Sequence, residues 1–379
     1  MKRIIYPERD NWQQRHLDIG FDYYNLPSTD GSIYWSEGVS YEFHLKQIEQ
    51  LEDAANELHQ MCLQVADRII QSGDYPDYFQ IPQTAIPSIE YSWKAKAPML
   101  YGRFDFAYDG QNIKMLEYNA DTPTGLLEAS VAQWHWIEEV QNVPHRDQFN
   151  SIHEDLIERW KQLFAPKSLV HFAACQEAGR EDWGNLEYLM DTAFQAGLSV
   201  SALSMENLGW DQTQFVDLND QAINHLFKLY PWEWIWEENF STFIKPDTQW
   251  IEPCWKMLLS NKAILVELWK QFPHHPLLLE SHAFNPNDRF NGKWVRKPIL
   301  AREGANIHII QNNVDCGEAS GSFHFKDYDK YGYIMQKWAP TPLHEGMLPT
   351  LGLWMVGDEC SGLSIREDVY DVIGNDAHF

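Results

Sequence analysis

Basic residues are scarce in this sequence. Its 379 residues contain 29 lysines and arginines against 55 aspartates and glutamates, for a formal net charge of −26. A surface this acidic argues against binding nucleic acid through its phosphates and against docking on anionic lipid. The acidic excess is compatible with a cationic substrate, although a solubilising surface is the simpler explanation. We therefore expect small-molecule partners, with neither nucleic acid nor a membrane among them.

Long apolar runs and closely spaced cysteines are also missing. The N-terminus, MKRIIYPERDNW, becomes polar too soon for a signal peptide, and no apolar run approaches membrane-spanning length. The cysteines are widely spaced and odd in number, without a CxxC pair: Cys62, Cys175, Cys254, Cys316 and Cys360. This pattern favours reduced thiols over a disulfide framework or a zinc site and predicts a cytoplasmic protein.

Several well-known catalytic motifs are absent. The sequence contains no HExxH, no GxSxG and no complete GxxxxGK[ST]. Metalloprotease, serine hydrolase and P-loop functions therefore have no support.

Apolar and aromatic residues, in contrast, are abundant. They include 17 Trp, 17 Tyr and 19 Phe, and the apolar content of 44% is enough for a substantial core. Helical periodicity runs through residues 44–71 and again through 149–163. A further helix is expected to open at Pro123, with Thr122 as its N-cap, and to end near Glu139. Residues 1–40 are rich in aromatics and turn formers and yield no assignable element.

The strand patterns predict an α/β fold of the mixed, α+β, kind. Residues 100–119 form a hairpin around Asp109-Gly110. Strand 168–174, helix 186–196 and strand 198–203 follow one another as in a parallel strand–helix–strand unit. From Lys293 onward short strands follow at antiparallel spacing.

The hairpin carries the clearest chemical signal. Strand side chains alternate faces, so Arg103 and Asp105 share one face, and Glu117 and Asn119 share another. If the connecting loop has an odd number of residues, Asp105 lies opposite Glu117 and Arg103 opposite Asn119. Two carboxylates and an amide oxygen suit Mg²⁺, and the arginine could hold an anion. A solvated hairpin face with two salt bridges explains the same spacing.

Four further segments are candidates, each with a simpler structural explanation. Lys297, followed by a turn at Gly304, could grip phosphates, or the segment could be an ordinary hairpin. Lys262 could be a phosphate ligand or an exposed first-turn residue. Arg366 could bind a carboxylate or form a salt bridge, and Glu181-Asp182 could hold an amine or merely open a helix.

Together these segments resemble the glutathionylspermidine synthase family, specifically its ATP-grasp synthetase part. The matching stretches occur in the same order over most of the chain: YGRFDFAYDG…KMLEYNADTPTGLLEA, FKLYPWEW, EPCWKMLLSNKAIL, VRKPILAREGANI, MQKW and GLSIRED. The chain looks like a stand-alone synthetase without the family's amidase domain. The resemblance implies an ATP-grasp-like fold, permuted as in eukaryotic glutathione synthetase, with a parallel α/β lobe on the substrate side.

The resemblance also implies an activity: an ATP-dependent carboxylate–amine ligase that forms an amide through an acyl phosphate. ATP is the co-substrate, and two Mg²⁺ ions are expected. The acid would be glutathione-like and the amine polyamine-like. A non-catalytic ATP-binding protein that keeps the fold is the alternative, and a glycoside hydrolase built on the many carboxylates is a weaker third possibility because it gives the lysines no role.

The family's site residues carry over onto this sequence as follows. Asp105, Glu117 and Asn119 match the Mg²⁺ ligands, and Arg103 matches the catalytic residue on the transferring phosphoryl group. Thr122, Arg366, Glu181 and Asp182 match substrate-binding positions. The implied ATP-binding set is Arg103, Phe104, Asp105, Lys262, Lys297, Glu303, Gly304, Met335, Gln336, Lys337, Trp338, Asp371, Val372 and Ile373.

The sequence departs from the family pattern at the substrate pockets. Trp234 stands where the family has a small hydroxyl residue, and Thr350 where a glutamine is expected on the adenine side. The last amine-binding acid, near Asp376, is not placed by the match. ATP chemistry is therefore the firmer prediction, ahead of glutathione and spermidine as substrates.

One synthetase unit over residues 1–379 is expected to contain three lobes. The first, 1–145, holds the long helix and the metal-site hairpin; the second, 150–235, is the α/β lobe; the third, 245–379, is the ATP-grasp nucleotide-binding lobe. Oligomeric state is not predicted.

Overall fold

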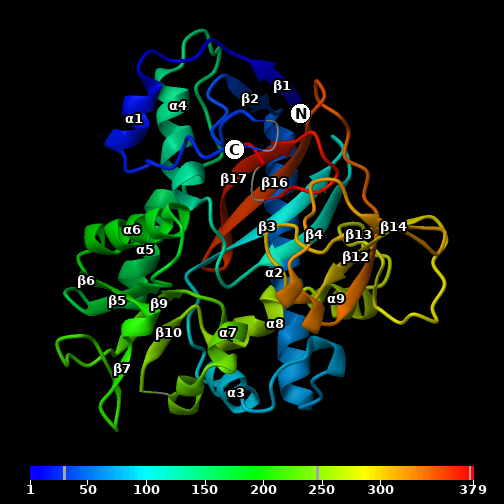
Figure 1. Cartoon of the computed structure of the whole chain (residues 1–379). Helices are drawn as coiled ribbons and strands as arrows, with labels where there is room; N and C mark the ends of the chain where they lie inside the picture. Colours follow the sequence, from blue (N-terminus) through cyan, green and yellow to red (C-terminus); the bar gives the residue numbers. More distant parts are fainter. Residues whose placement is uncertain (29–30, 245–246, 375–376) are drawn as a thin grey trace.

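The structure, a computed structural model, describes residues 1–28, 31–244, 247–374 and 377–379. Within these ranges the strands form three sheets of four or five strands and two small pairs (Figure 1). The orders are β10-β9-β5-β6, β11-β15-β12-β13-β14 and β17-β16-β3-β4, with β1-β2 and β7-β8 as the pairs. No described helix is both long enough and apolar enough to cross a bilayer.

The first part of the chain builds a long helix and a hairpin. The elements are β1 (Lys2–Ile5), α1 (Trp12–Asp18), β2 (Val39–Glu42), α2 (Leu45–Ser72), a 3₁₀ turn (Asp77–Phe79), α3 (Ile86–Lys94), β3 (Tyr101–Tyr108) and β4 (Ile113–Asn119). The helix expected over 44–71 and the hairpin over 100–119 are both confirmed. Apolar residues of α2, such as Leu58 and Cys62, pack in one core with Phe104 and Tyr118 of the hairpin.

The middle of the chain is the expected parallel unit. It runs through the π-helical turn Glu128–Ala132, α4 (Gln133–Glu139), α5 (Ile152–Leu163), β5 (Leu169–Ala174), α6 (Arg180–Gln195), β6 (Ser199–Ser204), Met205–Asn207 (3₁₀), β7 (Gly209–Trp210), β8 (Phe215–Val216), β9 (His225–Leu229), α7 (Trp232–Glu237), Asn239–Phe243 (3₁₀) and β10 (Gln249–Ile251). Strand β5 pairs in parallel with β6 and β9. Helix α6 begins six residues earlier than the sequence pattern suggested, which places Glu181 and Asp182 in its first turn.

The helix predicted to open at Pro123 was placed too early. Residues 122–125 form a loop, and the helix begins at Leu126. The first N–H group of this helix has a partner outside the helix, because the Leu126 N–H donates to Asn185 Oδ1 of α6 at 2.8 Å. A distant side chain therefore caps this helix in place of Thr122.

The last part of the chain contributes to two different sheets. Its elements are Cys254–Lys256 (3₁₀), α8 (Met257–Ser260), α9 (Ile264–Gln271), β11 (Ser281–Ala283), β12 (Lys293–Pro298), β13 (His308–Gln311), β14 (Val314–Glu318), Lys326–Lys330 (3₁₀), β15 (Tyr333–Lys337), β16 (Leu348–Val356) and β17 (Glu359–Asp368). The β-sheet contacts in this part are antiparallel, as expected.

Strands β16 and β17 do not join the sheet of β12. Strand β16 pairs with β3 instead, so the C-terminal hairpin lies beside the first hairpin, red against cyan in Figure 1. The chain ends close to its N-terminal segment, where the Ser36 N–H donates to the Phe379 carbonyl oxygen at 2.9 Å. The division into three lobes stays a prediction, but the pairing of β16 joins residues assigned to the first and third of them.

Candidate active site

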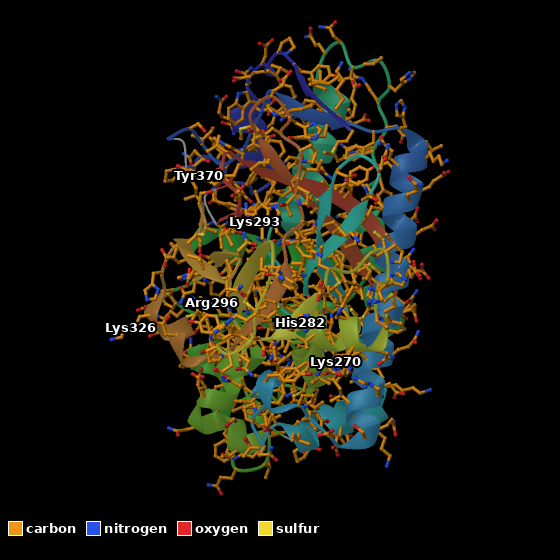
Figure 2. All side chains as sticks on the ribbon, turned by 90° about the vertical axis from the view of Figure 1, so that its right-hand side faces the viewer. Lys270, His282, Lys293, Arg296, Lys326 and Tyr370 are labelled. Carbon is orange, nitrogen blue, oxygen red and sulfur yellow. The ribbon has the colours of Figure 1, made fainter. Side chains whose placement is uncertain are left out.

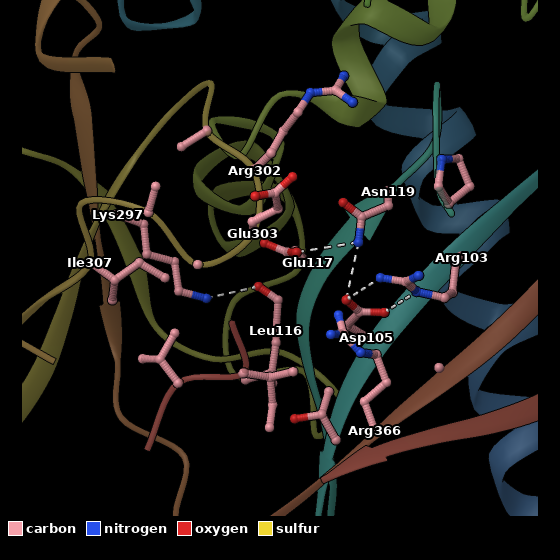
Figure 3. A pocket seen from close by; sticks show the side chains of 18 of the residues that line it. Arg103, Asp105, Leu116, Glu117, Asn119, Lys297, Arg302, Glu303, Ile307 and Arg366 are labelled. Atoms are coloured by element: carbon pink, nitrogen blue, oxygen red, sulfur yellow. Dashed lines mark hydrogen bonds and ion pairs between the residues drawn. The ribbon is translucent and has the colours of Figure 1, made fainter. Parts of the chain in front are cut away.

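One cavity of about 720 Å³ gathers most of the predicted site residues (Figure 3). The facing strands β3, β4, β12 and β15 contribute to its wall, as do the start of α6 and the segment after β17. The predicted residues that line it are Arg103, Asp105, Glu117, Asn119, Thr122, Glu181, Asp182, Lys262, Lys297, Glu303, Gly304, Gln336, Lys337, Trp338, Arg366, Asp371, Val372 and Ile373.

Two predicted residues do not line this cavity. Phe104 lies on the opposite face of β3 and stacks on Tyr118, with ring centroids 3.8 Å apart. Met335 packs with Trp294 and Ile310 in a separate small core. Both side chains are buried, as the alternation of a strand requires for the neighbours of residues that face a site. Asp376 lies outside the described residues.

The hairpin register brings the metal-site candidates together. Asp105 is opposite Glu117, and Arg103 is opposite Asn119, as predicted. The condition attached to that prediction, a connecting loop of odd length, is not met, because residues 109–112 connect the strands and this loop is even in length. A bulge after Asp105 restores the pairing: Phe106 pairs with Met115 and Asp105 with Glu117, which leaves Leu116 as the extra residue.

The bulge has a second consequence for the site. The Leu116 carbonyl oxygen, freed from the ladder, accepts a hydrogen bond from Lys297 Nζ at 3.3 Å. Lys262 reaches the same strand, with its Nζ 3.2 Å from Glu117 Oε2 and 2.7 Å from the Ala301 carbonyl oxygen. Two lysines from different elements are thereby held over the carboxylates of the hairpin.

Charge pairing sets the ionisation of this region. Burial favours the neutral form of Glu117, but Lys262 and Lys297 outweigh it and lower the pKa of Glu117 to about 2. Burial lowers the pKa of Lys297 to about 8, against the opposing pull of Glu117. Arg103 is also buried, yet the Asp105 carboxylate, 2.6 Å from its Nε, raises its pKa above the usual value. Glu117 therefore stays charged at neutral pH.

The donor set fits a divalent metal. The Asn119 amide bridges both carboxylates, with its Nδ2 3.1 Å from Asp105 Oδ2 and 3.2 Å from Glu117 Oε1. Carboxylate and amide oxygens are hard ligands of the kind Mg²⁺ prefers. In the described ranges no group of three or more His, Cys, Asp or Glu could hold a metal, so the amide of Asn119 is needed to complete this set.

A turn and the C-terminal segment close over the cavity. Gly304 has φ +71°, and a Cβ at this position would lie 2.8 Å from Val372 Cγ1 and 3.0 Å from the Ile373 carbonyl oxygen. The Val372 N–H donates to the Ser320 carbonyl oxygen at 3.0 Å. Such close approach requires glycine and places the predicted phosphate turn against the predicted adenine-side segment.

The predicted adenine side contains a cation held on an aromatic ring. Lys293 Nζ lies 3.6 Å from the Trp338 ring centroid and 3.5 Å from Asp371 Oδ2. Figure 2 shows Lys293 on the side of the molecule where Tyr370 also lies. Gln336 is buried, and its Nε2 donates to the Met115 carbonyl oxygen of β4 at 3.3 Å.

The substrate-side candidates lie in the same cavity in a different electrostatic setting. Burial, and then the neighbouring Glu181, raise the pKa of Asp182 to about 6. Arg366 Nη2 donates to the carbonyl oxygens of Gly374 at 2.8 Å and Ala377 at 3.4 Å. Trp234 lies on the cavity wall under the Arg302 guanidinium, 5.5 Å from the ring centroid.

Comparison with known proteins decides the family. The family described as glutathionylspermidine synthase preATP-grasp matches residues 3–379. The chain belongs to the glutathionylspermidine synthase family. A Haemophilus influenzae protein named "Putative acid--amine ligase" is 49% identical, over 100% of this chain and 98% of that protein. The resemblance drawn from the sequence is confirmed.

More distant members of the family are longer. Trypanothione synthetase from Crithidia fasciculata is 27% identical over 89% of this chain, and the bifunctional glutathionylspermidine synthetase/amidase of Escherichia coli is 26% identical over 84%. This chain covers 55% of each, about half their length.

Among solved structures, a glutathione synthetase-like effector from Globodera pallida shares the fold. The TM-score is 0.53, with 11% identity, and the match covers 97% of this chain and 98% of that one. The likeness confirms the expected fold class.

Sequence reasoning missed a buried ion pair just after the β3–β4 hairpin. Lys228 Nζ lies 2.6 Å from Asp121 Oδ1, and both side chains are at most 1% exposed. The Trp232 N–H donates to the other oxygen of Asp121 at 3.0 Å. Asp121 follows the motif of β4, but nothing near it in the sequence points to a lysine 107 residues away.

Proposed function

We propose that this protein uses ATP and Mg²⁺ to join a carboxylate to an amine through an acyl phosphate. Family membership supplies the coarse class, an acid–amine ligase. One observation carries the finer statement. Two carboxylates and an amide meet two lysines, Lys262 and Lys297, on the wall of one cavity.

The proposed role of each residue follows from its charge. Asp105, Glu117 and Asn119 would hold Mg²⁺, which neutralises phosphate charge when bound. Lys262 and Lys297 would bind the phosphates. Arg103, aligned by the Asp105 carboxylate through two hydrogen bonds, would stabilise charge on the transferring phosphoryl group. Such preorganised cations need no rearrangement as that charge develops.

The chemistry proceeds in two steps. A carboxylate oxygen of the acid attacks the γ-phosphorus, and ADP leaves. The amine then attacks the acyl carbon, the C–N bond forms, and inorganic phosphate departs. Arg366 is proposed to orient the acid, with Thr122, while Glu181 and Asp182 draw the amine. Family membership makes a glutathione-like acid and a polyamine-like amine the first substrates to test. The indole of Trp234 fills part of the cavity wall and argues for testing other acids beside glutathione.

The test uses purified protein with Mg-ATP and a panel of acids: glutathione, γ-glutamyl peptides and free amino acids. Hydroxylamine traps an acyl phosphate as a hydroxamate, and ADP release is followed in parallel. Asp105→Asn and Lys297→Met are expected to lower both signals by about 10²–10³-fold, the usual scale for losing one electrostatic group.

Lys161→Met is the matched control, since Lys161 is half-exposed, pairs with Glu158 and does not line the cavity. Circular dichroism checks that each variant is folded. Full activity in both site variants would contradict the assignment. Tight ATP binding without ADP release from any mixture would favour a non-catalytic ATP-binding protein.

A further inference from the structure

Two tyrosines of the N-terminal segment meet a buried glutamate beside the cavity. Glu128 has no exposed surface. Tyr34 Oη donates to Glu128 Oε1 at 2.9 Å, and Tyr23 Oη donates to Oε2 at 3.1 Å. Each carboxylate oxygen therefore accepts a hydrogen bond from one phenol, and the proposed function gives these groups no role.

The surrounding backbone fixes this arrangement. Glu128 stands on the π-helical turn Glu128–Ala132, a feature that often marks functional sites. The ring of Tyr23 packs against α6 at Gly184, where a Cβ atom would lie 2.6 Å from Tyr23 Cε1. Asn185, the next residue of α6, binds the Leu126 N–H. The N-terminal segment, the turn and α6 are thus packed against one another around Glu128.

Tyr34 connects Glu128 to the cavity, because Tyr34 lines the cavity and Glu128 does not. Besides Glu128 itself, the charged groups that act on Tyr34 come from three elements: Glu181 of α6, Arg366 of β17 and Arg103 of β3. The phenol therefore shares the cavity wall with Glu181, proposed to draw the amine, and with the arginines proposed for the acid and the phosphoryl group, and it feels the charge of each of them.

The electrostatic setting suits a proton acceptor. Burial, and then the charge of Glu181, raise the pKa of Glu128 to about 7, while the bonds from Tyr34 and Tyr23 oppose this shift. Burial also keeps the pKa of Tyr34 far above its usual value. Tyr34 can therefore pass a proton on but cannot keep a phenolate, whereas Glu128 can gain and lose a proton near neutral pH.

An alkyl amine is protonated at neutral pH and must lose a proton before it can attack. We infer that Tyr34 and Glu128 form the path that takes this proton from the amine substrate, an inference that rests on the proposed function. The ammonium gives a proton to Tyr34 Oη as the phenol proton moves to Glu128, whose carboxylate becomes a carboxylic acid. The free amine then attacks the acyl carbon, and the C–O bond to phosphate breaks. The second nitrogen proton leaves with the phosphate, and Glu128 later returns its proton to water.

Glu181 and Asp182 are competing acceptors, because both line the cavity directly. Their proposed task is to attract an ammonium group, which requires that they keep their negative charge. A buried acceptor behind Tyr34 separates the binding of the cation from the removal of its proton.

The decisive comparison uses two nucleophiles on the same acyl phosphate, formed from Mg-ATP and glutathione. Hydroxylamine is largely unprotonated at neutral pH and needs no base, whereas spermidine does. Tyr34→Phe and Glu128→Gln are expected to keep hydroxamate formation within about twofold and to lower amide formation by about 10²-fold, the lower end for general-base catalysis. Tyr78→Phe is the matched control, since Tyr78 also donates to a glutamate, Glu267, away from the cavity.

The pH profile of amide formation separates this path from a purely structural role. Tyr23→Phe removes a bond that stabilises the Glu128 carboxylate, so the acidic limb of the rate should move to higher pH. Infrared difference spectra of the apo protein, wild type against Glu128→Gln, should show one carboxylic acid titrating near neutral pH. These spectra require no turnover.

The outcomes are distinguishable. Hydroxamate and amide that fall together, equal amide formation in Tyr34→Phe and wild type, or a Glu128 that stays ionised across the titration would each overturn the inference while the ligase function stands. Wild-type protein that forms no hydroxamate with any acid of the panel would refute the proposed function and this inference with it.

Discussion

The two sides of the cavity treat charge differently. On the ATP side each carboxylate meets a cation: Arg103 lies 2.6 Å from Asp105, and Lys262 lies 3.2 Å from Glu117. On the amine side, within the described part of the chain, no basic side chain forms an ion pair with Glu181 or Asp182; Arg302 attracts Asp182 from a longer distance and pairs with Glu233. Paired charges hold a fixed geometry, which phosphoryl transfer needs. Unbalanced carboxylates, which have no ion-pair partner, create a negative electrostatic potential. A protonated amine that binds there neutralises this potential.

The largest expected effect comes from breaking the geometry of the ATP side without changing its charge. Arg103 donates hydrogen bonds to Asp105 through Nε and Nη2 and to the Thr124 carbonyl oxygen through Nη1. A lysine cannot make this fork, so Arg103→Lys should lower ADP release by about 10²–10³-fold with hydroxylamine or with spermidine as the nucleophile. Steady-state kinetics with both nucleophiles measure the effect. A loss confined to spermidine would show that Arg103 belongs to the amine side instead.

A substitution on the amine side should change a different kinetic quantity, the KM for the amine. Asp182→Asn keeps the shape of the side chain and removes one of two neighbouring charges, so the KM for spermidine is expected to rise about 10-fold, the scale of one partly buried charge contact. The hydroxamate rate should not change, since neutral hydroxylamine gains nothing from a carboxylate. Asp191→Asn, on the same helix but outside the cavity lining, is the control. An unchanged KM would remove Asp182 from the amine site.

The sequence could predict features that depend on local patterns, and it missed features that depend on distant residues. The metal-ligand candidates of the ATP side follow from a local pattern. Strand alternation pairs Arg103 with Asp105 and Glu117 with Asn119, and a connecting loop of odd length would bring the two pairs together. Even there the register depended on the bulge at Leu116, which periodicity does not reveal. The helix begins at Leu126, later than predicted, and the residue that caps it is Asn185, 59 residues beyond Leu126.

Long-range contacts were beyond prediction for a physical reason. Hydrophobic periodicity shows which face of a strand is buried but not which strand lies beside it, so the pairing of β16 with β3 could not be foreseen. The bond from Tyr34 to Glu128 joins residues 94 apart, and residues 1–40 gave no recognisable element. Resemblance to a family supplied the lysines and the order of the motifs, because spacing alone left each of them with a simpler explanation.

A last effect, no larger than that of Asp182→Asn, is an opposite response of the two sides to pH. The pKa of Lys297 is about 8, so this lysine loses its charge as the pH rises through that value, and the KM for ATP should increase roughly 10-fold by one pH unit above it. The pKa of Asp182 is about 6, so this carboxylate gains a proton as the pH falls through that value, and the KM for spermidine should increase on the acidic side instead.

Lys297→Arg tests the alkaline half of this response, because arginine keeps its charge over the whole range. The KM for ATP should then lose its rise above about pH 8, while the acidic rise in the KM for spermidine persists. Initial-rate measurements of ADP release, with either substrate varied at each pH, separate the two. If both KM values instead rose on the same side of neutrality, one shared group would control both sides of the cavity, and the division between a paired ATP side and an unbalanced amine side would be wrong.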